Sequence, residues 1–295
     1  MLKLEVTTTT PRAKVLMEHG QKFRILNVFE SSCNLVDSDA AVLSLVTSSI
    51  APGPFSAVVE PARKKNDGLF DFRDHIQAGS RVRATSEMLA IDDLRIVNIK
   101  DRCWEPRVNW ENTKAGQIRH FLPLLTNQIL ELAPEESLAT PILKETYQAF
   151  HHQKAAAAWE QLSNGIKCTD LTKFDEGVAD LAGLGPGLTP AGDDFLMGFI
   201  YSFWANSDIN SRKSMIKRII QLAGNRTNTL SRAWLEAAGR GEAAAPWHDL
   251  VKGIVRDDLT LVEETTNDIL DIGSSSGADA LAGFVATSIL LAQLP

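Results

Sequence analysis

The residues best able to do chemistry lie in one glycine-rich segment, GLGPGLTPAGDDFLMG, which runs from Gly183 to Gly198. Closely spaced glycines precede Thr189, a good N-cap residue, and Pro190, which suits the first position of a helix because no N–H is needed there. A helix N-terminus presents unpaired N–H groups and a partial positive charge, which favour an anion. We therefore interpret this segment as a site for a small anionic ligand.

Two familiar phosphate-binding motifs do not fit the segment. The dinucleotide motif GxGxxG would need a glycine where Leu188 or Pro190 stands, and a P-loop would need Lys and Ser where Asp193 and Asp194 follow Gly192. These carboxylates would repel a triphosphate unless a metal intervened. The alternative is that the glycines only make a well-capped turn while the aspartates complement the helix dipole.

The same signature recurs near the C-terminus, in IGSSSGADALAGF. Ser276 and Asp279 there form an S-x-x-D pattern, which is typical of a helix cap. The two copies share G-x-D-x-L-x-G-F, and the matched residues are Gly192, Asp194, Leu196, Gly198 and Phe199 against Gly277, Asp279, Leu281, Gly283 and Phe284.

This repeat predicts a site shared by two helices. A glycine inside a helix costs about 1 kcal/mol relative to alanine, so we expect Gly198 and Gly283 to let the two helices cross closely, with their N-termini on the same side. Asp194 and Asp279 would then converge, and each would raise the pKa of the other or recruit a cation, with Mg²⁺ as the first candidate. The alternative is two capped and tightly packed core helices.

A third helix start is predicted in NRTNTLSRAWLEAAGRGE, where Thr227, Thr229 and Ser231 supply hydroxyl groups and Arg226 or Arg232 a positive charge. An ordinary N-cap with surface arginines explains this segment equally well. The candidate catalytic residues and metal ligands are Asp194 and Asp279. The candidate substrate-binding residues are Gly185, Gly187, Leu188, Thr189, Gly192, Asp193, Thr229, Ser231, Ser275, Ser276 and Gly277.

Other catalytic or metal-binding patterns are weak. The six histidines have no metal-binding spacing, and we expect His151 and His152 to lie on a solvated helix face. The three cysteines are scattered and include no CxxC pair, which argues against a disulfide framework and a zinc site. No GxSxG motif marks a nucleophile.

Composition narrows the classes of function further. The chain has 295 residues and a net charge of -7, with no continuous basic run and no stripe of basic and aromatic residues, so we do not expect nucleic acid as a partner. No apolar run reaches the roughly 18 residues that a membrane span needs. The start of the chain lacks the apolar core of a signal peptide, so the cytoplasm is the expected compartment.

The pattern of elements predicts an α+β protein. A β-rich part, residues 1–112, contains predicted strands at 21–29, 41–49, 56–61, 80–91 and 93–100 without helices between them, which favours an antiparallel sheet or a small barrel. A helical part, residues 113–295, carries both glycine motifs. Whether the two parts are separate domains or one layered unit is left open. Its predicted helices are 116–132, 135–163, 190–206, 211–223, 228–238, 246–257, 260–271 and 277–293.

The blocks GLGPGLTPAGDD and SSGADALAGF resemble those of a bacterial family that was labelled a domain of unknown function and that includes AllH, the third subunit of oxamate carbamoyltransferase from anaerobic allantoin breakdown. The resemblance covers most of residues 180–295 in order. It extends only loosely into the β-rich part, through Gly53–Phe55. Ser274 departs from the pattern, because AllH-type blocks have a histidine there, which puts any role for that position in doubt.

The resemblance implies a component of a carbamoyltransferase that converts oxalurate and phosphate to oxamate and carbamoyl phosphate together with two other subunits. These substrates and products are small anions, in agreement with the helix N-termini. Because family members also occur outside allantoin pathways, the substrate can be another carbamoyl or amide compound. Two alternatives remain, a non-catalytic binding or scaffold subunit and a metal-dependent amidohydrolase-like enzyme.

Overall fold

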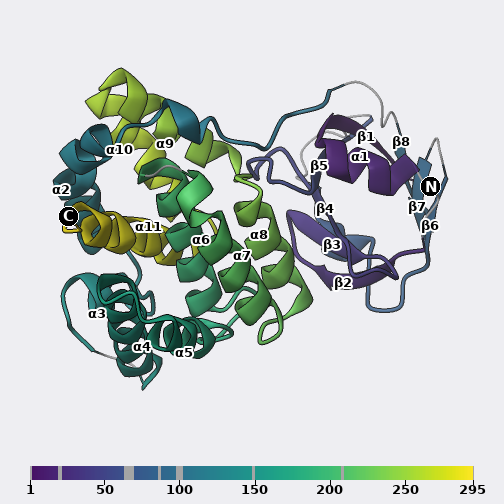
Figure 1. The fold of residues 1–295 in the computed structure, drawn as a ribbon. Coiled ribbons are helices and arrows are strands. Elements are labelled where there is room, and N and C mark those ends of the chain that lie inside the picture. Colours follow the sequence, from purple (N-terminus) through teal and green to yellow (C-terminus); the bar gives the residue numbers. More distant parts are fainter. Residues whose placement is uncertain are drawn as a thin grey trace. The chain divides into compact units, whose positions relative to one another are not determined.

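Figure 1 shows the fold in a computed structural model, which describes residues 2–18, 22–62, 70–85, 88–97, 102–147, 150–206 and 209–294. The chain divides into two compact units, of which the first comprises Met1–Arg107 with Ala243–Ala245 and the second comprises Val108–Glu242 with Pro246–Pro295. The first unit holds the strands and the second holds the long helices, so the predicted α+β class is confirmed. A boundary near residue 112 between independent domains stays a prediction.

The first unit is one eight-stranded sheet that is nearly closed, like a barrel. Alternate residues of its strands, such as Leu43 and Leu45 or Ile96 and Leu94, point into a common core, as a period of two requires. In spatial order the strands are β2 (Arg24–Val28), β3 (Ser32–Val36), β4 (Val42–Val46), β5 (Ser56–Pro61), β1 (Leu2–Thr9), β8 (Leu94–Val97), β7 (Met88–Ile91) and β6 (Val82–Ala84).

The sheet is mixed, since β1 pairs with β8 and β4 pairs with β5 in parallel while the other neighbours are antiparallel. Among the described residues no α-helix separates the predicted strands, but the unpredicted α1 (Pro11–Glu18) precedes them, between β1 and β2, and packs into the same core. Thr10 caps this helix through a 3.2 Å bond from the Ala13 amide, and Pro11 follows. This Thr-Pro pair is the sequence signal for the helix.

Two further strand expectations change. The segment 80–91 forms the hairpin of β6 and β7 rather than one strand, and β1 and β3 were not predicted. Residues 98–100 of the last predicted strand lie outside the described residues.

The second unit consists of helices, most of which match the prediction. The prediction of a single helix at 135–163 is wrong. Two helices, α3 and α4, occupy this segment, and between them Glu145 has a φ of 55°, which is incompatible with a continuous helix. The helix α5, with Asp170 as its N-cap, was not predicted. The helices are α2 (Ala115–Leu132), α3 (Ala139–Leu143), α4 (Phe150–Lys167), α5 (Leu171–Leu181), α6 (Ala191–Asn206), α7 (Ile209–Gly224), α8 (Thr229–Gly239), α9 (Ala245–Arg256), α10 (Leu259–Leu270) and α11 (Ser276–Ala292).

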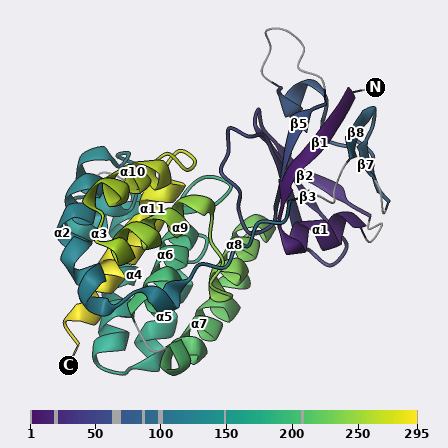
Figure 2. The ribbon, with the colours of Figure 1, turned by 90° about the horizontal axis from the view of Figure 1, so that it is seen from above.

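Helices α6 and α11 form the centre of this unit, with the others around them (Figure 2). Both are buried over almost their whole length, since they are apolar on every side rather than along one stripe. A polar side chain on either helix therefore sits in a low-dielectric environment unless it lies at an end. Among the described residues, no helix is long and apolar enough to cross a membrane.

Candidate functional site

Helices α6 and α11 pack side by side and run in the same direction. Near their N-termini, the hydroxyls of Thr189 and Ser276 lie 2.8 Å apart. Near their C-termini, the hydroxyls of Ser202 and Ser288 lie 2.9 Å apart. The predicted pairing of the two helices, with both N-termini at one end, is confirmed.

Glycines permit this close crossing, as expected. A Cβ on Gly198 would lie 1.7 Å from the carbonyl oxygen of Ala280, and one on Gly283 would lie 2.0 Å from that of Phe195. Ala280 and Phe195 occupy matching places in the two copies of the motif, so the contact is reciprocal. No larger residue fits at either glycine unless the backbones move apart.

The crossing brings two buried carboxyl groups together. Asp194 and Asp279 are each the fourth residue of their helix, and only 4% and 0% of them is exposed. Oδ1 of Asp279 accepts a 2.6 Å bond from the amide of Leu138. Oδ2 of both aspartates is buried and has no hydrogen-bond partner among the described residues. The charge on Asp279 acts on Asp194, so the two carboxyls lie within electrostatic reach of each other, and each has one unsatisfied oxygen.

Burial makes both groups weak acids. Burial raises the pKa of Asp279 to about 7. The hydrogen bonds from the Leu138 amide and the Ser275 hydroxyl act in the opposite direction, because they favour the charged carboxylate. Burial, followed by the charge on Asp279, raises the pKa of Asp194 well above its ordinary value, while the Ser276 and Thr189 hydroxyls act in the opposite direction. Because a buried carboxyl resists ionisation, the pair can hold a proton near neutral pH.

The loop before α3 is a part of the site that sequence reasoning missed. It supplies the Leu138 amide to Asp279 and is itself held by the ring nitrogen of His152, which lies 3.3 Å from the carbonyl oxygen of Glu136. The expectation that His152 lies on a solvated face is wrong, because it is buried beneath this loop and its burial lowers its pKa. His151 is half-buried and stacks edge-on against it. The only sequence signal was the His-His pair itself.

Asp193 serves a different purpose from Asp194. Its carboxylate accepts a 2.9 Å bond from the Gly183 amide and a bond from the Thr227 hydroxyl, so it joins the glycine-rich loop to the segment before α8. Asn228 caps α8 and also donates to the carbonyl oxygen of Leu188 at 2.7 Å. The third helix start therefore does adjoin the loop. Asn228, which the hydroxyl pattern overlooked, is its N-cap.

The loop glycines are required by backbone conformation. Gly183, Gly185 and Gly187 have φ values of 73°, 105° and 103°, a region that L side chains rarely adopt. Along the loop, burial increases from the exposed Gly187 and Leu188, through the half-buried Thr189, to the buried Asp194. The loop thus leads from the surface to the carboxyl pair.

Several predicted site residues contact neighbouring helices or begin a helix, and among the described residues none of their contacts is with the carboxyl pair. A Cβ on Gly192 would lie 1.9 Å from the Leu181 carbonyl oxygen, and one on Gly277 would lie 1.7 Å from that of Ile269, so each lets its helix begin against the end of the preceding one. Ser231 is buried, and its hydroxyl has no hydrogen-bond partner among the described residues. Thr229 begins α8, and its hydroxyl makes no hydrogen bond with the part of the chain that the structure describes.

Two capping expectations are corrected. Helix α6 begins at Ala191, so Pro190 stands just before its first position and Thr189 is not adjacent to it. Ser275, not Ser276, is the N-cap of α11, and no side-chain bond completes the cap. The first residue of α11, Ser276, instead contacts Thr189, and Asp279 bonds to Leu138. The proposed charge partner Arg232 pairs with Glu236 on its own helix.

The fit of Mg²⁺ to the pair is limited. Among the described residues, no three His, Cys, Asp or Glu side chains gather into a metal-binding group. A Mg²⁺ ion would have two carboxylates and nearby hydroxyls as protein ligands, and it prefers six oxygens. The two carboxyls by themselves can accept hydrogen bonds, donate one when protonated, and exchange a proton.

Comparison with known proteins identifies the family. The model described as oxamate carbamoyltransferase subunit AllH matches residues 181–288, and the model of the AllH family N-terminal domain matches residues 6–101. The first match runs from the loop before α6 to the C-terminal half of α11, so it contains both glycine motifs and both aspartates. No solved structure matches the chain. The chain belongs to the AllH family.

Proposed function

We propose that this member of the AllH family is a subunit of an oxamate carbamoyltransferase and that Asp194 and Asp279 recognise the carbamoyl group of its substrate. The observation that carries the proposal is the meeting of two buried carboxyls, each with an unsatisfied oxygen, at paired helix N-termini within the matched segment. The substrate class is a small anionic carbamoyl compound, with oxalurate as the first candidate.

The chemistry of a half-protonated carboxyl pair suits this group. A carbamoyl group offers N–H donors and a carbonyl acceptor in one plane. An ionised carboxylate accepts from the N–H groups, while a protonated carboxyl donates to the carbonyl oxygen. The backbone N–H groups and dipoles at the starts of α6 and α11 favour the anionic end of the same molecule.

The pair also supplies a proton where the reaction needs one. A phosphate oxygen attacks the carbamoyl carbon of oxalurate, and the bond from that carbon to the oxamate nitrogen breaks. The departing nitrogen must gain a proton, which a carboxyl with a raised pKa provides as a general acid. The attacking hydrogen phosphate loses its proton as the new C–O bond forms, and this proton restores the protonated pair, so the reaction consumes no net proton. Partner subunits complete the site, and the expected compartment is the cytoplasm.

Burial of both aspartates favours a second candidate, a non-catalytic scaffold subunit. In that case the protonated pair joins α6 to α11, and the chemistry takes place on other subunits. Titration calorimetry of the full chain with oxalurate, oxamate and carbamoyl phosphate, with and without Mg²⁺, distinguishes the two. We expect binding of at least one compound, with Asp194→Asn weakening it at least about tenfold.

Heat signals that are identical in the wild type and in Asp194→Asn would contradict a role for the carboxyl pair. No signal with any compound, together with tight binding to the other subunits, would identify the chain as a scaffold. A Mg²⁺-dependent signal would favour metal-assisted chemistry, because the ion would then bridge the carboxylates and the substrate.

A further inference from the structure

A second feature of the helical unit lies apart from the carboxyl pair, in the hairpin of α7 and α8. Between Arg212 and Arg240 the sequence has seven cationic residues and one acidic residue, Glu236, although the whole chain has a net charge of -7. The cations stand singly or in adjacent pairs and form no longer run, so they do not stand out in the sequence. Helices α7 and α8 pack side by side (Figure 1), which brings the cations of α7 from Lys213 onward near those of α8.

The hairpin has a groove with an apolar floor. The groove encloses about 380 Å³ and is lined by Ile216 and Ile220 of α7, Gly239 of α8 and the Trp204 ring of α6. A Cβ on Gly239 would lie 2.1 Å from Cδ1 of Ile220, so the glycine lets this side chain lie against the α8 backbone. The indole N–H of Trp204 donates to the Ala238 carbonyl oxygen at 2.9 Å, which fixes the ring at the end of the groove.

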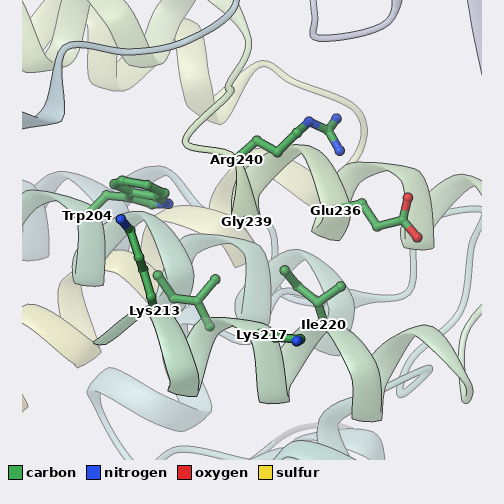
Figure 3. Close-up of a pocket in the computed structure, with 8 residues that line it drawn as sticks. Trp204, Lys213, Lys217, Ile220, Glu236, Gly239 and Arg240 are labelled. Atoms are coloured by element: carbon green, nitrogen blue, oxygen red, sulfur yellow. The ribbon is translucent and has the colours of Figure 1, made fainter. Parts of the chain in front are cut away.

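Charged side chains surround this floor (Figure 3). Lys213 lies beside Trp204, Lys217 lies further along α7, and Glu236 and Arg240 stand on the α8 side. Arg240 already pairs with Glu242, and Glu236 already pairs with Arg232. Lys217 and the exposed Arg226 make no ion pair with the described residues. The groove therefore combines apolar surface with positive charge that the chain itself does not fully neutralise.

We propose that the α7–α8 hairpin is the docking surface for an acidic segment of a partner subunit, with apolar side chains of that segment seated on Ile216, Ile220 and Trp204. An extended segment fits better than a small anion, because the cations stand at several points along α7 and the loop after it and the groove is open. Charge complementarity of this kind speeds association and selects the partner. The inference rests on the proposed function, which makes the chain one subunit of a complex.

The test uses the full chain and the co-expressed partner subunits of the carbamoyltransferase. Their affinity is measured by biolayer interferometry at about 50 and about 300 mM salt, because salt screens exposed charges. The double variant Lys213→Glu/Lys217→Glu should weaken binding at least about tenfold at low salt and lose most of the salt dependence. The matched control, Lys144→Glu/Lys167→Glu, makes the same change of net charge on exposed residues of the α3–α4 region.

Equal affinities of the wild type and both variants, at both salt concentrations, would overturn the docking proposal and leave the proposed function standing. A wild-type chain that binds no partner subunit at all would overturn both. Circular dichroism confirms that the variants fold. If the Lys213/Lys217 variant loses affinity for total RNA but not for the partner subunits, the α7–α8 surface binds nucleic acid and the proposal is wrong.

Discussion

At the scale of single residues, two adjacent aspartates do different work. Asp193 has its carboxylate bound by the Gly183 amide and by Thr227, and so holds the loop in place. Asp194 faces α11 and shares its surroundings with Asp279. The repeat of the motif favoured Asp194 as the residue that faces a ligand, because Asp279 matches Asp194 and has no counterpart of Asp193 beside it. That choice stays a prediction.

The raised pKa of Asp279 predicts a pH-dependent stability. The carboxyl has an ordinary pKa of 3.8 and a pKa of about 7 in the folded protein, so the folded state binds its proton more tightly. Its favourable contribution is complete below about pH 4 and is lost as the pH rises toward 7. Asp279→Asn keeps the acceptor for Leu138 and does not ionise. The variant should therefore gain stability relative to the wild type as the pH rises from 4 to 8, by on the order of 1–4 kcal/mol.

Urea unfolding of both proteins across this pH range measures the difference. The Asp193→Asn variant is measured in the same way for comparison. Burial raises the pKa of the Asp193 carboxyl as well, whereas the hydrogen bonds that this carboxyl accepts act to lower its pKa. A constant difference in unfolding free energy between the wild type and Asp279→Asn from pH 4 to pH 8 would show that Asp279 does not titrate in the folded protein.

At the scale of elements, the site is built from two helix pairs with the same plan. In each pair a helix ends, a short loop follows, and the next helix begins with a glycine placed against the carbonyl group near the end of the first: Leu181 with Gly192, and Ile269 with Gly277. The second helices of the two pairs then cross at Gly198 and Gly283. The carboxyls meet because they occupy the same position in both copies.

The crossing glycines should therefore be essential for folding. In Gly198→Ala or Gly283→Ala, the new methyl group meets a backbone carbonyl that cannot turn away, and we expect a loss of about 3 kcal/mol or more. Gly116→Ala is the control, because this glycine lies in α2 with nothing within 4 Å of its Cβ position. Alanine there should be neutral or slightly stabilising. Thermal unfolding checks all three variants, and equal melting temperatures would contradict the crossing.

The sequence predicted most helices and the central pairing, since repeated glycines at one spacing have few other physical explanations. It did not predict the Leu138 amide or the buried His152, because a loop that packs on a helix through backbone groups leaves no side-chain pattern. Strands β1 and β3 were not predicted for a related reason, since their neighbours in the sheet rather than their own composition define them. Parallel pairing of β1 with β8 joins residues far apart in the chain, which local periodicity does not report.

At the scale of the whole molecule, the chain combines an acidic composition with one basic hairpin, and both family models match in the expected order. The carboxyl pair and the α7–α8 groove belong to the same helical unit and share α6, but Asp194 lies near the start of that helix and Trp204 near its end. A subunit that binds substrate at one place and a partner at another needs this separation, because each surface can then change without the other.

The most direct test of the central claim is turnover of oxalurate and phosphate by the reconstituted carbamoyltransferase. Asp194→Asn and Asp279→Asn should each lower kcat by at least about 100-fold, because the amide is no general acid. Ser288→Ala is the control, since it removes a buried hydrogen bond at the other end of the same helices and should leave kcat within about twofold. Wild-type kcat in both aspartate variants, with the complex intact, would contradict the claim.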